Sequence, residues 1–190
     1  MKLALFPLPI FLLPGGFTRL RIFEQRYLYM IKEAAKTEQG FVLCPYVDDM
    51  PYNVPSEGVH VKIVDFSQED DGQLLIDVEA VSRVSINGVE VDSQSLRYGK
   101  CEIIDGPPWQ CSEAAYNLID DSLVDKLHSV FIANPVLDDL YREKHFTQPL
   151  WVVYRWLEIL PISMSQKLKI KQAQTFEQVA DFLHTVLDEK

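Results

Sequence analysis

The triplet Gly106-Pro107-Pro108 divides this chain into two parts with different hydrophobic periodicity. Before the triplet, apolar and polar residues alternate over short runs, as they do in half-buried β-strands. After it, apolar residues recur with the spacing of one face of an α-helix. A glycine followed by two prolines continues neither a helix nor a central strand, because proline has no backbone N–H donor. We therefore expect an α+β fold, with a β-rich domain at residues 1–106 and a helical bundle at residues 107–190.

The first part contains one helical pattern among several strand patterns. The helical pattern runs from about residue 24 to residue 37, and its apolar face consists of Tyr27, Met30, Ile31 and Ala34. Strands are expected at residues 3–6, 19–22, 41–44, 58–66, 74–80, 84–91 and 98–104, with turns at Asp71-Gly72 and Asn87-Gly88. Six or seven short strands with one early helix favour a small, closed or nearly closed β-barrel.

The second part is patterned as a series of helices. A long apolar stripe predicts one helix over residues 112–133, which Pro135 ends. Four shorter helices are expected over residues 136–144, from a cap at Thr147 to Pro161, and after the capping-box pairs Ser163/Gln166 and Thr175/Gln178.

Composition and the amino terminus limit the class of protein. Hydrophobic residues make up 47% of the chain and charged residues 24%, which excludes general disorder. The net charge of -10 argues against a nucleic-acid partner, which requires a basic surface. The apolar stretch up to Leu13 resembles a signal peptide, but Pro7, Pro9 and Pro14 interrupt it. It is also too short to span a membrane, so we expect no membrane association.

The residues that usually carry catalysis or bind metals are dispersed. The three cysteines, Cys44, Cys101 and Cys111, include no C-x-x-C motif, and an odd number of them suits free thiols in a reducing cytoplasm. The four histidines show no ligand spacing, and the acidic pairs lie in predicted loops or on polar helix faces. The P-loop, G-x-S-x-G and H-E-x-x-H motifs are absent from the sequence. We therefore expect no catalytic residue, no cofactor and no metal site.

Arg19, Arg21 and Arg26 form the one concentrated basic cluster, and aromatic residues lie beside them in the sequence. In an RNA-binding protein such arginines contact phosphates while the aromatic rings stack on bases. The structural alternative is that Arg21 or Arg26 pairs with Glu24 and other nearby carboxylates. We favour the structural alternative.

The amino-terminal block LALFPLPIFLLPGGFTRLRIFEQRYLYMIKEA resembles the opening of Lon-type substrate-binding domains. The family pattern is FPLP, a few apolar residues, P-G, then LRIFEPRY and an amphipathic helix. The matching residues that we regard as candidate structural or binding residues are Phe6, Pro7, Pro9, Pro14, Gly15, Arg21, Phe23, Glu24, Arg26 and Tyr27. Gln25 replaces a frequent proline of the family. Weaker matches continue downstream through residues 58–63, 78–84 and 157–161.

This resemblance implies a PUA-like β pseudo-barrel followed by a helical bundle. In Lon proteases the corresponding region engages unfolded substrates, while the ATPase and peptidase modules lie elsewhere in the protein. We therefore expect a stand-alone Lon-like domain that lacks those modules and binds unfolded or exposed protein segments in the cytoplasm. The alternatives are an RNA-binding PUA-like module and an enzyme whose site has no recognised motif.

Overall fold

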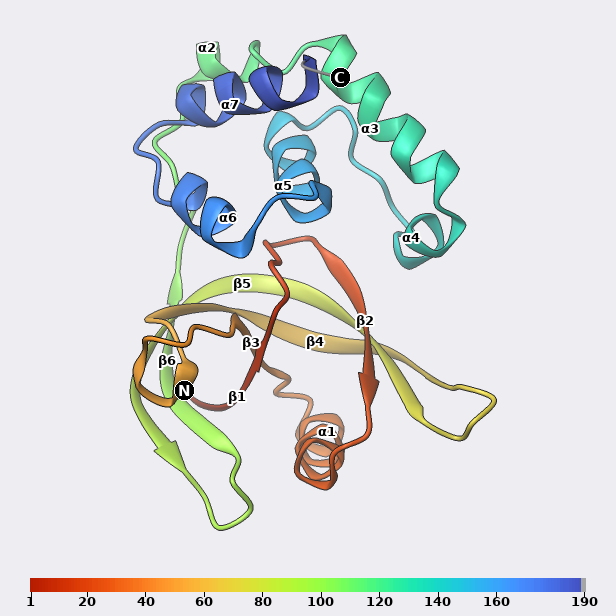
Figure 1. The fold of residues 1–190 in the computed structure, drawn as a ribbon, viewed down its shortest axis with the longest axis vertical. Helices are drawn as coiled ribbons and strands as arrows, with labels where there is room; N and C mark the ends of the chain where they lie inside the picture. Colours follow the sequence, from red (N-terminus) through yellow and green to blue (C-terminus); the bar gives the residue numbers. More distant parts are fainter. Residues whose placement is uncertain (189–190) are drawn as a thin grey trace. The chain divides into compact units, whose positions relative to one another are not determined.

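A computed structural model describes residues 1–188 of the chain (Figure 1). The chain forms two compact units, one from Met1 to Asp105 and a second that begins at Gly106. The first unit is rich in β-strands, and the second unit is helical. The predicted α+β class, a β-barrel followed by a helical part, is confirmed.

The first unit contains six strands and one α-helix, together with a short 3-10 helix at Pro51–Asn53. The elements in chain order are β1 (Lys2–Leu8), β2 (Phe17–Ile22), α1 (Gln25–Thr37), β3 (Phe41–Pro45), β4 (Glu57–Gln68), β5 (Leu74–Val91) and β6 (Arg97–Ile104). The predicted helix and the predicted strand patterns correspond to these elements, with one exception in β5.

Five of the strands form a closed ring. β1 pairs in parallel with β3 and antiparallel with β6. β4 pairs antiparallel with both β3 and β5, and β5 closes the ring by pairing with β6. β2 lies outside the ring and pairs antiparallel with the first half of β5. β5 therefore forms hydrogen-bonded pairs with three strands, β2, β4 and β6. With 18 residues it is long enough to pair with β2 and β6 over different segments.

The turn predicted at Asn87-Gly88 is wrong. β5 runs through this point without interruption, and the register with β6 shifts between Asn87 and Glu90. Gly88 has a φ of +57°, a conformation that suits glycine at a β-bulge. The hairpin turn comes five residues later, where the Asp92 carboxylate accepts hydrogen bonds from the backbone N–H groups of Gln94 and Leu96. Asn-Gly within an alternating run can therefore mark either a hairpin turn or a β-bulge, and the sequence alone does not distinguish the two.

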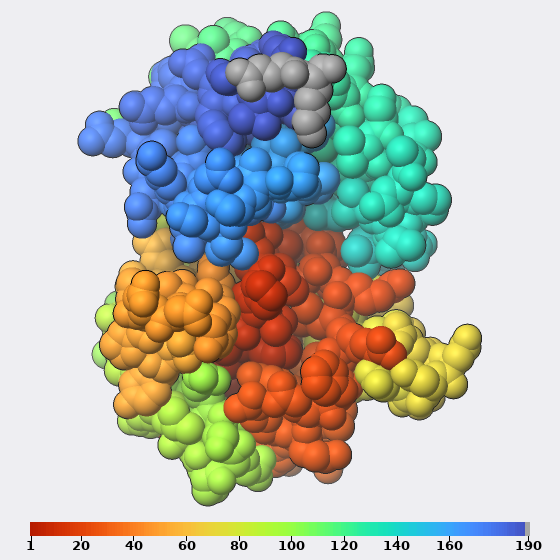
Figure 2. Space-filling view, in the orientation of Figure 1, coloured from red at the N-terminus to blue at the C-terminus, as the bar shows by residue number. Residues whose placement is uncertain are grey.

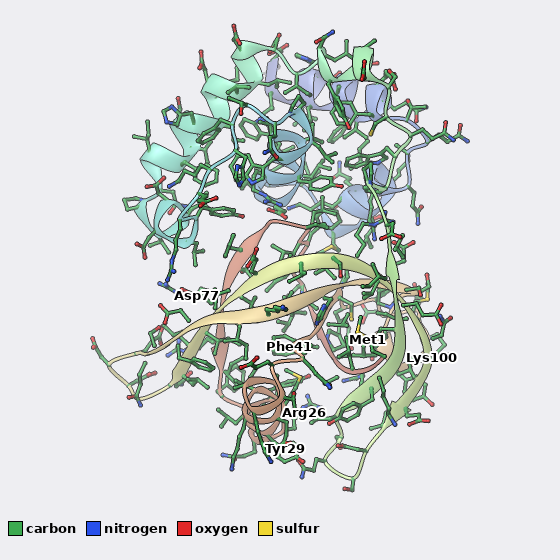
Figure 3. All side chains as sticks on the ribbon, turned by 180° about the vertical axis from the view of Figure 1, so that it is seen from behind. Met1, Arg26, Tyr29, Phe41, Asp77 and Lys100 are labelled. Atoms are coloured by element: carbon green, nitrogen blue, oxygen red, sulfur yellow. The ribbon has the colours of Figure 1, made fainter. Side chains whose placement is uncertain are left out.

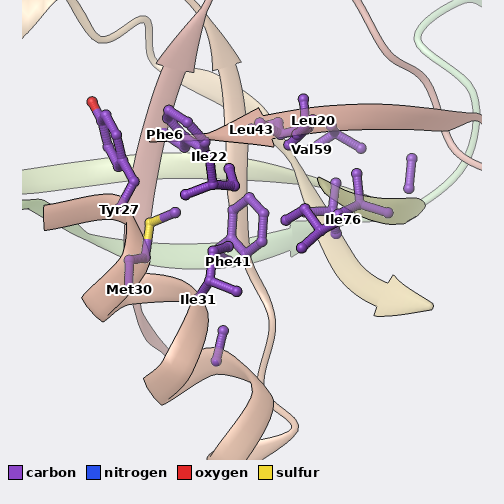
Figure 4. Packing of buried hydrophobic residues seen from close by; sticks show 14 of the residues in the cluster. Phe6, Leu20, Ile22, Tyr27, Met30, Ile31, Phe41, Leu43, Val59 and Ile76 are labelled. Carbon is purple, nitrogen blue, oxygen red and sulfur yellow. The ribbon is translucent and has the colours of Figure 1, made fainter. Parts of the chain in front are cut away.

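The core next to α1 is built by the apolar face that the sequence predicts. Tyr27, Met30, Ile31 and Ala34 are all buried. They pack with Phe6 of β1 and Phe41 of β3, as Figure 4 shows. The rings of Phe6 and Tyr27 stack at a centroid distance of 4.0 Å. This contact joins the end of β1 to the start of α1.

The second unit contains six helices in its described part, one more than expected. They are α2 (Glu113–Tyr116), α3 (Asp121–Ala133), α4 (Pro135–Leu140), α5 (Pro149–Ile159), α6 (Met164–Lys171) and α7 (Phe176–Asp188). The single helix predicted over residues 112–133 is wrong, because Asp120 caps a new helix by accepting a hydrogen bond from the N–H of Leu123 at 3.0 Å.

Helix boundaries elsewhere in the second unit follow local chemistry. The cap predicted at Thr147 is wrong, because Gln148 is the N-cap of α5 and Pro149 is its first residue. The capping box of Ser163 and Gln166 is confirmed at the start of α6. Across residues 1–188, no helix combines the length and the apolar character that crossing a membrane requires.

Candidate binding site

A pocket of about 280 Å³ opens on the first unit where the end of β1, the strand β2 and the start of α1 meet. Its lining residues are Phe6, Leu8, Pro9, Ile10, Arg19, Leu20, Arg21, Ile22, Phe23, Glu24 and Tyr27. Most of these side chains are apolar, and all of them come from the first 27 residues of the chain. The amino-terminal block therefore encloses a pocket by itself.

Two stacked aromatic rings form part of the pocket lining. The Phe6 and Tyr27 rings are both buried and stack with an interplanar angle of 28°. Burial raises the pKa of the Tyr27 phenol, and nearby Arg26 partly opposes this rise. Leu8 ends β1, and Pro9 follows it without a backbone N–H to extend the ladder. The chain then leaves the sheet, and Leu8, Pro9 and Ile10 remain to form one wall.

One large aromatic side chain of the lining is exposed. Phe23 is 66% exposed, although its neighbour in the chain, Ile22, is buried at the end of β2. Phe23 lies between the strand and the helix, just before Glu24, which is the N-cap residue of α1. Phe23 therefore adds exposed apolar surface to the lining of an apolar pocket.

The three arginines of the basic cluster are paired with carboxylates. Arg19 donates two hydrogen bonds of 2.7 Å to Asp77 on β5. Arg26 pairs with Glu24 at 2.7 Å, and its guanidinium lies 4.7 Å from the centroid of the Tyr27 ring. These contacts fix the arginines against the first unit.

Arg21 has different partners from those expected. It pairs with Glu69 and Asp71, which lie in the turn between β4 and β5. This hairpin, yellow in Figure 2, protrudes from the surface of the first unit. The pairing links the polar β4–β5 turn to the lining of the pocket through one side chain. It also neutralises the charge of Arg21.

The ten candidate residues of the amino-terminal block are not all in the pocket. Phe6, Pro9, Arg21, Phe23, Glu24 and Tyr27 line it. Pro7 lies within β1, and Arg26 contacts the ring of Tyr27 from α1. Gly15, next to Pro14, has a φ of +73° and donates a hydrogen bond of 2.7 Å to the Ala80 carbonyl. Pro14 and Gly15 therefore act on the turn before β2.

Sequence reasoning missed five lining residues: Leu8, Ile10, Arg19, Leu20 and Ile22 were not among the ten candidates. Arg19 belongs to the basic cluster of the sequence, and Leu20 and Ile22 belong to a predicted strand. Leu8 and Ile10 alternate with Pro7 and Pro9 in the sequence, so one side of this segment is apolar. That alternation is the signal that could have identified them.

The two thiols of the first unit, Cys44 and Cys101, are buried. Burial raises the pKa of the Cys44 thiol to about 12 and raises that of Cys101 as well. A thiol with a raised pKa carries little thiolate at neutral pH and is a poor nucleophile. Within residues 1–188, no group of three or more His, Cys, Asp or Glu side chains is placed to hold a metal ion.

Comparison with known proteins gives one consistent result. The family profile described as "ATP-dependent protease La (LON) substrate-binding domain" matches residues 2–185. The chain is similar to a crystal structure of a Lon N-terminal domain protein from Xanthomonas campestris, with 25% identity, a TM-score of 0.71 and coverage of 97% of this chain and 98% of the other. No curated protein matches the sequence.

A second solved structure shares the fold. It is the N-terminal domain of a Mycobacterium avium complex Lon protease, with 15% identity, a TM-score of 0.69 and coverage of 97% of both chains. The profile match extends over nearly the whole chain, including both the block that builds the pocket and the helical unit. The chain therefore belongs to the family of Lon substrate-binding domains.

Proposed function

We propose that the pocket between β1, β2 and α1 binds apolar side chains of unfolded or exposed segments of other proteins. The observation that carries this proposal is Phe23, a strongly exposed aromatic side chain in the lining of an apolar pocket. A volume of about 280 Å³ is just below the range of small-molecule sites, about 300–1,000 Å³, and it suits one or two side chains of a polypeptide. Folded proteins bury such side chains, so unfolded segments are the natural source of them.

Two features support a polypeptide ligand over RNA. Arg19, Arg21 and Arg26 are all paired with carboxylates. A phosphate backbone would have to displace those carboxylates and would also meet a chain whose net charge is -10. We propose that nucleic acid is not the ligand of this surface.

We further propose that the protein is non-catalytic and that it works in the cytoplasm as a PUA-like binding domain. The raised pKa values of the Cys44 and Cys101 thiols support a non-catalytic role. A cytoplasmic location is supported by the three free cysteines, because thiols persist in a reducing compartment. They are Cys44, Cys101 and Cys111. We also propose that residues 1–106 and 107–190 behave as separate domains.

The test uses a fluorescently labelled client, a disulfide-bonded protein that has been unfolded by reduction and carboxymethylation. This chain is titrated into the labelled client, and binding is followed by fluorescence anisotropy. The same protein in its native, disulfide-bonded form is the control. We expect saturable binding of the unfolded form and none of the native form. Equal signals for both forms, or no binding of several unfolded proteins, would contradict the proposal.

A further inference from the structure

A second pocket, of about 220 Å³, lies on another flank of α1. It is lined by Lys2 and Ala4 of β1, by Tyr29 and Glu33 of α1 and by Tyr98 of β6, among others. Tyr29 is 42% exposed. It lies on the outer side of the helix, away from the core residue Phe41, as Figure 3 shows. This pocket shares no lining residue with the pocket next to Phe23.

One carboxylate, that of Glu33, and the phenol rings of Tyr29 and Tyr98 line this second pocket. Tyr29 and Glu33 are four residues apart on α1, so their side chains project from the same flank of the helix. The Glu33 carboxylate has no ion-pair or hydrogen-bond partner among residues 1–188. Burial raises the pKa of the Tyr98 phenol, and the negative charges of Asp92 and Glu33 contribute to the rise. Glu33 and Asp92 thus both act on the Tyr98 hydroxyl.

The ammonium group of Lys2 already lies near the ring of Tyr98. The Lys2 ammonium lies 5.8 Å from the centroid of the Tyr98 ring, within the range of a cation–π contact. Lys2 also forms an ion pair of 2.5 Å with Glu90, so its charge is compensated outside the pocket. The Lys2 contact places a cation near the Tyr98 ring, while the Glu33 carboxylate has no ion-pair partner within residues 1–188.

We propose that this pocket binds the guanidinium group of an arginine side chain from a partner protein, which pairs with Glu33 and packs against the rings of Tyr29 and Tyr98. Guanidinium suits the site better than ammonium, because its planar face stacks on an aromatic ring while its edge donates two hydrogen bonds to a carboxylate. The proposal goes beyond the apolar pocket, since it concerns other residues and another ligand chemistry.

The test is an NMR titration of the full chain with acetyl-Gly-Arg-Gly-amide, following the backbone amides of residues 29–40 and 98. The matched probe is the same peptide with citrulline, which keeps the shape of arginine and removes its charge. We expect shifts confined to these amides with the arginine peptide and none with the citrulline peptide. Equal shifts with both peptides, or shifts spread over the chain, would overturn the proposal.

Two variants and a second probe sharpen the experiment. Glu33→Gln should weaken binding of the arginine peptide roughly two- to fivefold, the range of one exposed ion pair. Glu38→Gln removes the same charge from an exposed residue next to α1 and outside the pocket, so it should leave the affinity unchanged. Equal effects of both variants would reduce the site to general charge attraction and overturn the proposal.

Methylguanidinium is the second probe. If it binds as tightly as the peptide, the pocket is a site for a free cation, and the proposal is overturned. None of these results depends on whether the Phe23 pocket binds unfolded protein.

Discussion

The ring of Phe6, near the end of β1, stacks on the ring of Tyr27, in the first turn of α1, with their centroids 4.0 Å apart. Both side chains are buried, and both line the pocket that Phe23 borders. The same two rings therefore belong to the core of the first unit and to the surface that we propose for client binding. Stability and binding are coupled at this point.

Replacing Tyr27 with alanine should destabilise the first unit by about 3–5 kcal/mol, because it removes a buried ring and leaves a cavity. Tyr27→Phe keeps the ring and should cost less than about 1.5 kcal/mol. Urea unfolding followed by far-UV circular dichroism measures both values. A similar loss of stability in the two variants would show that the hydroxyl, and not the stacked ring, matters.

The buried ion pair of α5 should be strongly coupled. Arg155 is fully buried, donates to Glu158 at 2.7 Å and lies 5.5 Å from the ring centroid of Trp151. Glu158→Leu leaves a buried guanidinium without its carboxylate and should cost about 3–5 kcal/mol. The double variant Arg155→Met/Glu158→Leu removes both charges and should be more stable than Glu158→Leu alone.

Tryptophan fluorescence measures this effect in the second unit selectively, because Trp109, Trp151 and Trp156 all belong to that unit. Urea midpoints of Glu158→Leu, of the single variant Arg155→Met, of the double variant and of the parent chain complete the cycle. Additive losses would show that Arg155 and Glu158 contribute independently, contrary to their geometry.

The thiols should differ in reactivity. Cys44 and Cys101 are buried, whereas Cys111 is partly exposed. At pH 8 a disulfide reagent such as Ellman's should react first with Cys111, and with all three thiols once the chain is unfolded in guanidinium chloride. A Cys111→Ser variant should lose the fast phase. A fast phase that remains would place a reactive thiol in the barrel.

The same burial predicts a pH dependence of stability. The pKa of Cys44 is about 12 in the folded protein against an ordinary value of 9.0. Above pH 9 the unfolded chain loses this proton first, so the free energy of unfolding should fall as the pH rises from 9 towards 12. Cys44→Ala should make that decline shallower when urea midpoints are compared at pH 8 and pH 10.

Local patterns were sufficient for most of the fold. The 3.6-residue period of α1 identified its buried face, and Gly106-Pro107-Pro108 marked the change from strands to helices. Predictions from local patterns were wrong where the same pattern is compatible with two local structures. Gly88 occupies a bulge and not a turn, and the apolar stripe across residues 112–133 continues past the break that Asp120 caps.

The candidate site was predictable only in part. The motif residues Phe6, Phe23 and Tyr27 lie in the pocket because they belong to one continuous block. Long-range partners were not predictable. Arg19 pairs with Asp77 because the antiparallel register of β2 and β5 places the two residues opposite each other. Arg21 pairs with Asp71 in the turn between β4 and β5. The second pocket depends likewise on β6, which brings Tyr98 to α1 from more than 60 positions away in the sequence.

The most direct test of the proposed function is the affinity of Phe23→Ser for a labelled unfolded protein, compared with that of Ile103→Ser. Both residues are exposed, at 66% and 58%, but Ile103 lies in β6 and does not line the pocket. We expect both variants to remain as stable as the parent chain, because neither side chain is part of the core. Phe23→Ser should bind the unfolded protein about tenfold more weakly, the loss expected for one well-placed aromatic contact, while Ile103→Ser should bind normally. Unchanged affinity of Phe23→Ser, or an equal loss in both variants, would contradict the assignment of the pocket.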